Sequence, residues 1–413
     1  MNQQESFEQY AMSLLEKPEL AEAIRHGQEL LRASVPDADP VSLEKLPAAS
    51  VETALNALLN VVNHGLTLPQ PRLIMRLPRE NNEGHIPGTR GLHDNPDTFY
   101  RIIPVSSDSD FILEGVFEGE PGTIVELSLL SRQWETLANF SKPQLLQRHQ
   151  RKFRVQVGQE QAEEDTLFMR SRDDVEMLIV RETLSRWGRQ QPCALHLSPV
   201  QPVNQADGID LDGEFDKALE RVRRWFEQCV ALQSEPLSLP ANTMPQPVIT
   251  SEFGKLVTQA YAIGHFDLAE GQAMIITVSL GSASYFVVPV TNLWGVSENP
   301  ASQQSSLNND QAVANADGSY TFVVSPTDPG VLNWVDTSPL RRGFLFLRWA
   351  GLDPAAPSSD EILLATRTCT INELQQYLPA DTRWIDPVQR EQALLRRQQE
   401  HLARYTIIDR STN

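Results

Sequence analysis

The most informative part of the sequence is Asp328-Pro329-Gly330-Val331-Leu332-Asn333-Trp334-Val335-Asp336-Thr337, together with the run Gly343-Phe344-Leu345-Phe346-Leu347-Arg348-Trp349 that follows it. Pro329 and Gly330 suit the central positions of a type II turn, because proline fixes the first φ and glycine tolerates the positive second one. The apolar run that follows has the length of a strand rather than of a helix. A turn followed by a short apolar strand is typical of a β-sandwich or a β-barrel.

Short apolar runs of this kind extend through most of the chain from about residue 73. They are interrupted by Gly, Pro, Asn and Asp, as expected of strands joined by turns. The runs fall into two blocks, at 101–105, 111–117, 123–130, 153–157 and 175–180, and at 273–280, 284–291, 319–325 and 343–349. We therefore expect a mainly β protein with accessory helices, of class α+β, built from two antiparallel sandwiches.

Helical periodicity precedes the first strand block and separates the two blocks. The apolar residues of 51–65 recur at helical spacing, and we expect that helix to end at Gly65 and to follow a loop containing Pro36, Pro40 and Pro47. An amphipathic helix at 212–233, expected to pack on a sheet, leads into a proline-rich connector.

A further helix is expected after the second strand block. Asp386-Pro387-Val388-Gln389 contains an N-cap, a proline at the first helical position and a glutamine at the third. From there to about Arg404 the sequence is rich in charge, and we expect these charges to form a solvated face.

These patterns divide the chain into a helical N-terminal region (1–72), a first β-sandwich (73–205), the amphipathic helix and connector (206–247), a second β-sandwich (248–370) and a C-terminal helical tail (371–413). The two sandwiches could be distant repeats, because Met177-Leu178-Ile179-Val180-Arg181 and Phe344-Leu345-Phe346-Leu347-Arg348 both end an apolar strand with arginine. Chance similarity between two short strands explains the match equally well, so both interpretations stay open.

Composition and charge disfavour several classes of partner. The 413 residues have a formal net charge of -19, which opposes nonspecific binding to nucleic acid or anionic lipid. No apolar stretch approaches the roughly 18 residues that span a bilayer, and the first 32 residues lack a secretory pattern, so we expect a cytoplasmic protein without membrane insertion. Cys193, Cys229 and Cys369 are odd in number and far apart, which predicts buried free thiols.

Several segments share the order of motifs found in one known family. They are Asp94-Asn95-Pro96-Asp97 with Tyr100, Leu178-Ile179-Val180-Arg181, Asn292-Leu293-Trp294, Asp317-Gly318 and the block from 328 to 349. This order resembles the family called domain of unknown function 1214, whose chemistry is not settled. The resemblance implies two jelly-roll-like β-sandwiches with accessory helices.

Two histidines that are common in that family are absent from this chain. Ser325-Pro326 precedes the Asp-Pro-Gly turn where the family often has Ala-His, and Ser338-Pro339 follows the Asp-Thr pair where it often has Gly-His. A mechanism that uses those imidazoles as bases or metal ligands therefore does not carry over, and we expect no metal. The sequence also lacks the glycine-rich phosphate loops and nucleophile elbow of common enzymes, so we expect no cofactor.

The polar residues of the 328–349 block are the candidate active site. A carboxylate, an amide and a guanidinium beside apolar walls are the groups from which small-molecule pockets are built. We expect Asp336 to act as acid or base, Asn333 as a polar anchor and Arg348 as a charge partner. Substrate contacts are expected from Trp334, Trp294, Asn292, Arg181 and Asp328. A purely structural role, with Asp336 and Arg348 as an ion pair, explains the same residues.

Two functions remain open at this point. The first is a cofactor-independent acid/base enzyme, of lyase or hydrolase type, that acts on a lipophilic small molecule in a cavity between or within the sandwiches. The second is a noncatalytic small-molecule-binding or assembly module, for which a homo-oligomer is also an option. A metal held by His85 and His93, with Asp94 and Asp97 nearby, is disfavoured because the spacing matches no standard site.

Overall fold

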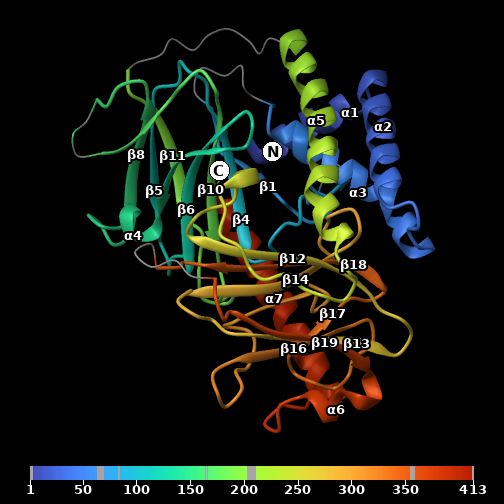
Figure 1. Ribbon diagram of the computed structural model, residues 1–413. Coiled ribbons are helices and arrows are strands. Elements are labelled where there is room, and N and C mark those ends of the chain that lie inside the picture. The colour runs from blue at the N-terminus through green and yellow to red at the C-terminus, as the bar shows by residue number, and fades with distance from the viewer. Residues whose placement is uncertain are drawn as a thin grey trace.

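Two β-sandwiches form most of the molecule, with their strands running in different directions (Figure 1). The computed structural model describes residues 3–62, 69–81, 84–162, 164, 166–201, 211–353 and 359–411. The expected class, mainly β with accessory helices and two jelly-roll-like sandwiches, is confirmed. The expected helix stop at Gly65 lies outside the described residues.

The first sandwich consists of a five-stranded and a four-stranded sheet. The five-stranded sheet has the order β1 (Arg72–Ile74), β4 (Thr98–Pro104), β10 (Val175–Thr183), β6 (Ile124–Ser131) and β7 (Thr136–Ser141). The other has the order β11 (Ala194–Pro199), β5 (Phe111–Val116), β8 (Lys152–Gly158) and β9 (Leu167–Arg170). A small hairpin, β2 (Arg79–Asn81) with β3 (Gly84–Ile86), lies outside both sheets.

The second sandwich consists of two four-stranded sheets. One has the order β12 (Gln259–Asp267), β18 (Arg342–Ala350), β14 (Tyr285–Thr291) and β15 (Ser306–Asn308). The other has the order β17 (Trp334–Asp336), β16 (Tyr320–Ser325), β13 (Gln272–Val278) and β19 (Leu363–Thr370).

The two sandwiches have the same topology. The order β4-β10-β6-β7 corresponds to β12-β18-β14-β15, and β11-β5-β8-β9 corresponds to β19-β13-β16-β17. Each sandwich also contains one parallel pair at the corresponding place, β8 with β9 and β16 with β17, where the sequence predicted antiparallel strands throughout. The two five-residue matches seen in the sequence occupy the third to seventh positions of β10 and of β18. Equal strand order and equal register favour duplication over chance similarity.

Alternation along β10 and β18 separates core residues from outward-facing ones, because successive side chains of a strand point to opposite faces. Leu178 and Val180 lie in the core between the sheets of the first sandwich. Leu345 and Leu347 have the same place in the second. The residues between them therefore face outward, away from each core, and this outward face includes both strand-ending arginines.

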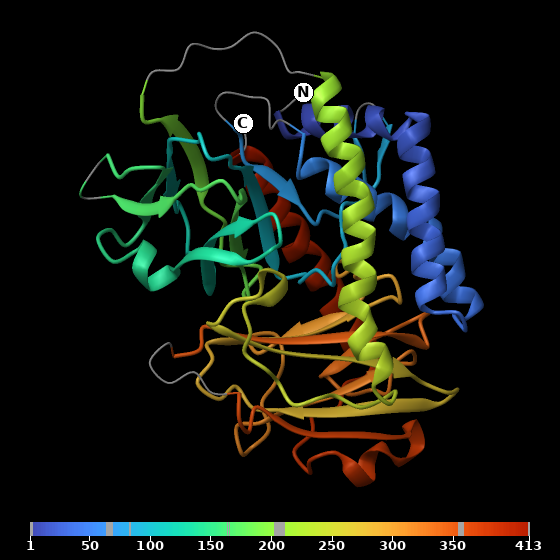
Figure 2. The same ribbon diagram turned by 45° about the horizontal axis from the view of Figure 1, so that its top comes forward.

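Four helices form a layer beside the sandwiches: α1 (Gln3–Leu15), α2 (Pro18–Ser34), α3 (Pro40–Leu59) and α5 (Leu211–Ser238). The expected packing of the amphipathic helix on a sheet is only partly right, since α5 packs chiefly on α2 and α3 (Figure 2). Gly27 permits this approach, because a Cβ there would lie 2.3 Å from the ring of Phe226. The apolar cluster under the helices also includes Ile179 and Phe344, so it joins both sandwiches.

The predicted loop before residue 51 is wrong, because Pro40 occupies the first turn of α3 and Pro47 lies inside the helix. Asp39 caps this helix by accepting a hydrogen bond from the Ser42 N–H at 3.1 Å. Proline is favoured in a first turn, where its missing N–H has no helical partner, whereas Pro47 removes one hydrogen bond. The burial of twelve residues of α3, Leu46 and Leu55 among them, compensates for that loss.

The helix α7 (Pro387–Ser411) bridges the two sandwiches. Its predicted start is confirmed, since Asp386 and Gln389 exchange hydrogen bonds between side chain and backbone N–H in both directions. The expected solvated face is wrong in part, because one stripe of the helix is buried: Arg390, Arg397, His401 and Arg404. Arginine side chains supply both the contact area and the hydrogen bonds of that stripe.

The remaining helices are short: α4 (Lys142–Leu145), α6 (Leu374–Tyr377) and the two 3-10 turns Glu252–Gly254 and Ile371–Glu373. Within the described ranges, no helix combines the length and apolar character needed to cross a membrane. The three cysteines are buried free thiols, as predicted.

Candidate functional site

The structure does not bring the three expected catalytic residues together. Asp336 accepts a hydrogen bond from the Ser338 N–H at 2.8 Å, and burial raises the pKa of its carboxyl. Asn333 bonds the backbone of Val313 in both directions. Arg348 donates instead to the carbonyl groups of Phe346 and His93, so a cavity shared by all three residues and the alternative Asp336–Arg348 ion pair are both wrong.

The expected substrate-binding residues near the same block have structural partners. Asp328 is paired with Arg390 of α7, with an Oδ2 to Nε distance of 2.9 Å. The guanidinium of Arg390 also lies 4.9 Å from the ring centroid of Trp334. The indole N–H of Trp294 donates to the Ser42 carbonyl. The side-chain oxygen of Asn292 accepts a hydrogen bond from the backbone N–H of Trp294 and so closes the turn between these two residues. Four of the five residues expected to contact a substrate therefore stabilise turns and helix contacts.

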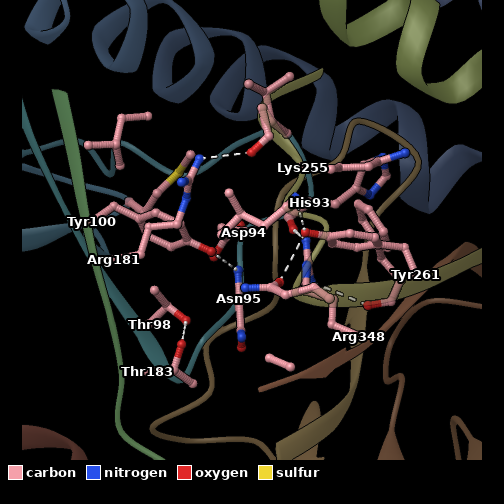
Figure 3. A pocket seen from close by; sticks show the side chains of 18 of the residues that line it. His93, Asp94, Asn95, Thr98, Tyr100, Arg181, Thr183, Lys255, Tyr261 and Arg348 are labelled. Atoms are coloured by element: carbon pink, nitrogen blue, oxygen red, sulfur yellow. Dashed lines mark hydrogen bonds between the residues drawn. The ribbon is translucent and has the colours of Figure 1, made fainter. Parts of the chain in front are cut away.

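Arg181 and Arg348 instead meet at a pocket between the two sandwiches (Figure 3). The cavity has a volume of about 150 Å³ and is lined by residues of both sandwiches, of the loop at 92–95, of α5 and of the loop at 254–256. Its walls are largely apolar, with contributions from Ile74, Leu92, Ile124, Ile179, Leu232, Leu256 and Phe346.

Strand register explains why the two arginines converge. Arg181 is the seventh residue of β10 and lies opposite Tyr100, the third residue of β4. Arg348 is the seventh residue of β18 and lies opposite Tyr261, the third residue of β12. Each sandwich thus contributes one tyrosine and one arginine from equivalent positions to the same cavity, on opposite sides of it in Figure 3.

Both guanidinium groups are held by neutral oxygen atoms. Arg181 donates to the Ser128 hydroxyl at 2.7 Å and to the Gly254 carbonyl at 3.0 Å. Arg348 donates to the carbonyl of His93, and its guanidinium lies 4.0 Å from the ring centroid of Phe346. Among the residues that the structure describes, no carboxylate lies within ion-pair distance of either arginine. Burial lowers the pKa of Arg181, and the charge of Glu126, which lies opposite Arg181 on β6, opposes that shift without overcoming it.

The loop that accepts the hydrogen bond from Arg348 has an unusual backbone. Leu92 and His93 both have left-handed φ angles, 52° and 56°, which cost side-chain-bearing residues of the order of 1 kcal/mol each. The His93 N–H is fixed by the Gly295 carbonyl at 2.8 Å. Backbone strain of this kind persists where the surroundings hold it, and it concentrates at functional sites.

His93 itself is a neutral side chain of the pocket. Its Nδ1 lies 2.8 Å from the Thr291 hydroxyl, and its Nε2 is buried without a hydrogen-bond partner. Burial, together with the charges of Arg348 and Lys255, lowers its pKa to about 3. The imidazole therefore adds no charge to the pocket at neutral pH.

Two further groups set the electrostatics of the cavity. The Asp94 carboxylate accepts both the N–H and the hydroxyl of Ser297, at 3.1 and 2.7 Å, so its two oxygen atoms are already bonded. Lys255 lies with its Nζ 5.6 Å from the Tyr261 ring centroid, and burial followed by repulsion from Arg348 lowers its pKa. Burial raises the pKa of the Tyr261 hydroxyl to about 12, so this hydroxyl stays protonated and uncharged at neutral pH. The pocket is consequently cationic.

The metal considered at His85 and His93 finds no support in this geometry. His85 is exposed and lies beside Glu80, whereas His93 is buried in the pocket. In the parts of the chain described above, no group of three or more histidine, cysteine, aspartate or glutamate side chains is placed to hold a metal ion.

Sequence reasoning missed Tyr100, Tyr261, His93 and Lys255 as pocket residues. The signal that could have found two of them is the internal repeat. When 177–181 is aligned with 344–348, the strands that pair with them, β4 and β12, each have a tyrosine opposite the arginine: Tyr100 and Tyr261.

Comparison with known proteins gives the fold and no activity. No protein-family model and no curated protein matches the chain. A crystal structure of an uncharacterised protein from Burkholderia cenocepacia is similar over 88% of this chain and 99% of that one, with a TM-score of 0.70 and 19% identity. A Vibrio parahaemolyticus protein gives a TM-score of 0.41 at 13% identity, over 68% of this chain and 90% of its own. The resemblance to the domain of unknown function 1214 family therefore stays a prediction.

Proposed function

We propose that the pocket between the sandwiches binds a small organic carboxylate with an apolar body. The observation that supports this most directly is the convergence of Arg181 and Arg348 in a largely apolar cavity, where neither has a carboxylate partner. A partly buried guanidinium without a carboxylate in contact is unfavourable, and a carboxylate is the anion whose geometry it matches best.

The size of the cavity limits the ligand. A cavity of about 150 Å³ holds a molecule of about the size of benzene. The ligand expected from the sequence was lipophilic, and the apolar walls support that part of the expectation. The guanidinium groups of Arg181 and Arg348 place positive charge among those apolar walls, which favours a ligand that is also an anion.

Binding is favoured over the acid/base chemistry that the sequence suggested. Asp336, the expected acid or base, bonds Ser338 and does not line this cavity. Within the pocket, the lowered pKa of His93 makes its imidazole a weak base, and the raised pKa of Tyr261 makes its hydroxyl a weak acid at neutral pH. The proposal is accordingly a small-molecule-binding protein, the second of the two functions considered from the sequence.

Calorimetric titration with benzoate and its neutral analogue benzamide tests this proposal. Benzoate is expected to bind at least tenfold more tightly, and the double variant Arg181→Gln/Arg348→Gln is expected to remove that preference because no guanidinium charge then remains in the pocket. Arg172→Gln is a matched control, since Arg172 is half exposed and paired with Asp174 on the surface. Equal affinity for the acid and the amide, or loss of preference in the control, would contradict the proposal.

A further inference from the structure

The pocket consists of two equivalent halves. Tyr100 and Arg181 occupy the same positions in the first sandwich as Tyr261 and Arg348 in the second. The correspondence continues beyond these pairs, because Ile124 and Tyr285 are each the first residue of their strands, β6 and β14, and both line the cavity. Duplication of the sandwich has therefore produced two cationic ends around one space.

Each cationic end is fixed by its own anchor. Arg181 is bonded to Ser128 and to Gly254, whose φ of 67° is a conformation that glycine adopts without strain. Arg348 is bonded to the carbonyl of His93 and stacked on Phe346. Turning both guanidinium groups toward a single carboxylate would break hydrogen bonds on both sides of the cavity, which is unfavourable.

Residues from outside the two sandwiches complete the cavity. Leu92 and Leu232 line it from the loop at 92–95 and from α5. Asp94 and Asn95, which are bonded to Ser297 and Tyr285, lie between the two arginines in Figure 3. Two guanidinium groups at separate ends of a largely apolar space match a molecule that has a short carbon chain and an anionic group at each end. A four-carbon diacid has eight non-hydrogen atoms, a size close to the roughly benzene-sized volume of the cavity.

We propose that the ligand is a short dicarboxylate, one carboxylate of which is bound by Arg181 and the other by Arg348. This inference rests on the proposed function and narrows it from a carboxylate to a diacid. Each arginine would form a charge-assisted pair with one carboxylate of the ligand. The tyrosine of each half lies directly opposite its arginine on the neighbouring strand.

The test compares succinate with succinamate, in which an amide replaces one carboxylate without a change of shape, and with butyrate. Calorimetric titration of the unaltered protein is expected to show succinate binding at least tenfold more tightly than either. Succinamate binding within twofold of succinate would overturn the diacid while leaving the proposed carboxylate site intact. Failure of these acids and of benzoate to bind would overturn both.

Two variants then assign the carboxylates to their arginines. Arg181→Gln and Arg348→Gln are each expected to lower succinate affinity to that of butyrate, and to change butyrate affinity by less than about fivefold because one arginine remains. A loss confined to one variant would show that a single arginine binds the ligand, and would overturn the inference. Thermal midpoints verify folding, and the wild-type comparison of succinate with succinamate decides the matter if a variant does not fold.

Discussion

His93 is a histidine that the fold keeps neutral. Its ring is in edge contact with Phe344 and Phe346, and the charged groups that face it, Arg348 and Lys255, both disfavour the imidazolium form. The folded-state pKa of about 3 lies below the ordinary value of 6.5. The unfolded chain therefore binds a proton at His93 at a higher pH than the folded chain does.

Stability is consequently expected to fall as the pH falls from about 6.5 toward 3. The contribution of His93 is about 1.4 kcal/mol per pH unit, because one more proton is bound in the unfolded state across that window. Urea unfolding of His93→Gln at pH 7 and pH 5 should show a smaller loss of stability than the wild type.

The exposed His85 supplies the matched control for this prediction. His85→Gln should leave the pH dependence of unfolding unchanged, because that side chain lies in solvent. A wild-type pH dependence in His93→Gln would show that His93 takes up its proton at the same pH in the folded and the unfolded chain, and would contradict the lowered pKa.

Among the elements, α7 shows how charged residues can join two sheets. Arg397 donates to the Pro300 carbonyl at 2.6 Å and to the Ser306 hydroxyl at 2.9 Å, and it stacks 4.3 Å from the ring centroid of Trp187. Pro300 and Ser306 belong to the second sandwich and Trp187 to the first. One side chain therefore contacts both sandwiches.

Removing Arg397 should weaken that connection. Arg397→Ala is expected to lower the free energy of unfolding by about 2–4 kcal/mol, because two charge-assisted hydrogen bonds and a stacked contact are lost together. The adjacent Arg396 is exposed, so Arg396→Ala should change the free energy of unfolding by less than about 0.5 kcal/mol. Urea denaturation measures both, and equal effects would mean that the buried contacts of Arg397 contribute little.

The elements were largely predictable from the sequence, whereas the site was not. Strands such as β10 and β18 carry an apolar pattern that ends in a charge, and such a pattern depends on local residues alone. The site depends on register between strands far apart in the sequence, which no local pattern contains. Proximity in the sequence predicts that Asp336 and Arg348 share a cavity, but β17 belongs to the sheet opposite the one that carries Arg348, so the two side chains lie apart.

For the molecule as a whole, a buried carboxylate at Asp97 links the two sandwiches. Its oxygen atoms accept hydrogen bonds from Trp187 of the first sandwich at 2.8 Å, and from Tyr285 and Asn308 of the second at 2.7 and 2.8 Å. Asp97 is fully buried, so all three bonds are shielded from water.

The two sandwiches are therefore expected to unfold together. Differential scanning calorimetry should give one transition, and Asp97→Asn should lower its midpoint by about 2–5 °C because an amide cannot accept all three donors. Asp108→Asn is the control, since Asp108 is exposed at a turn. Two separate transitions in the unaltered protein would show that each sandwich is stable alone.

The position of α7 has a consequence for the order of events during synthesis. The helix follows both sandwiches in the chain and yet connects them, through Arg390 and Arg397 to the second and through Arg404 to the Pro96 carbonyl of the first. About 40 residues separate the end of β19 from the end of α7, which a ribosome moving at about 5–20 residues per second adds in roughly 2–8 s. During that interval all strands of both sandwiches have been synthesised, but the surfaces that α7 covers are still exposed. Chaperones and nascent chains on neighbouring ribosomes can bind there.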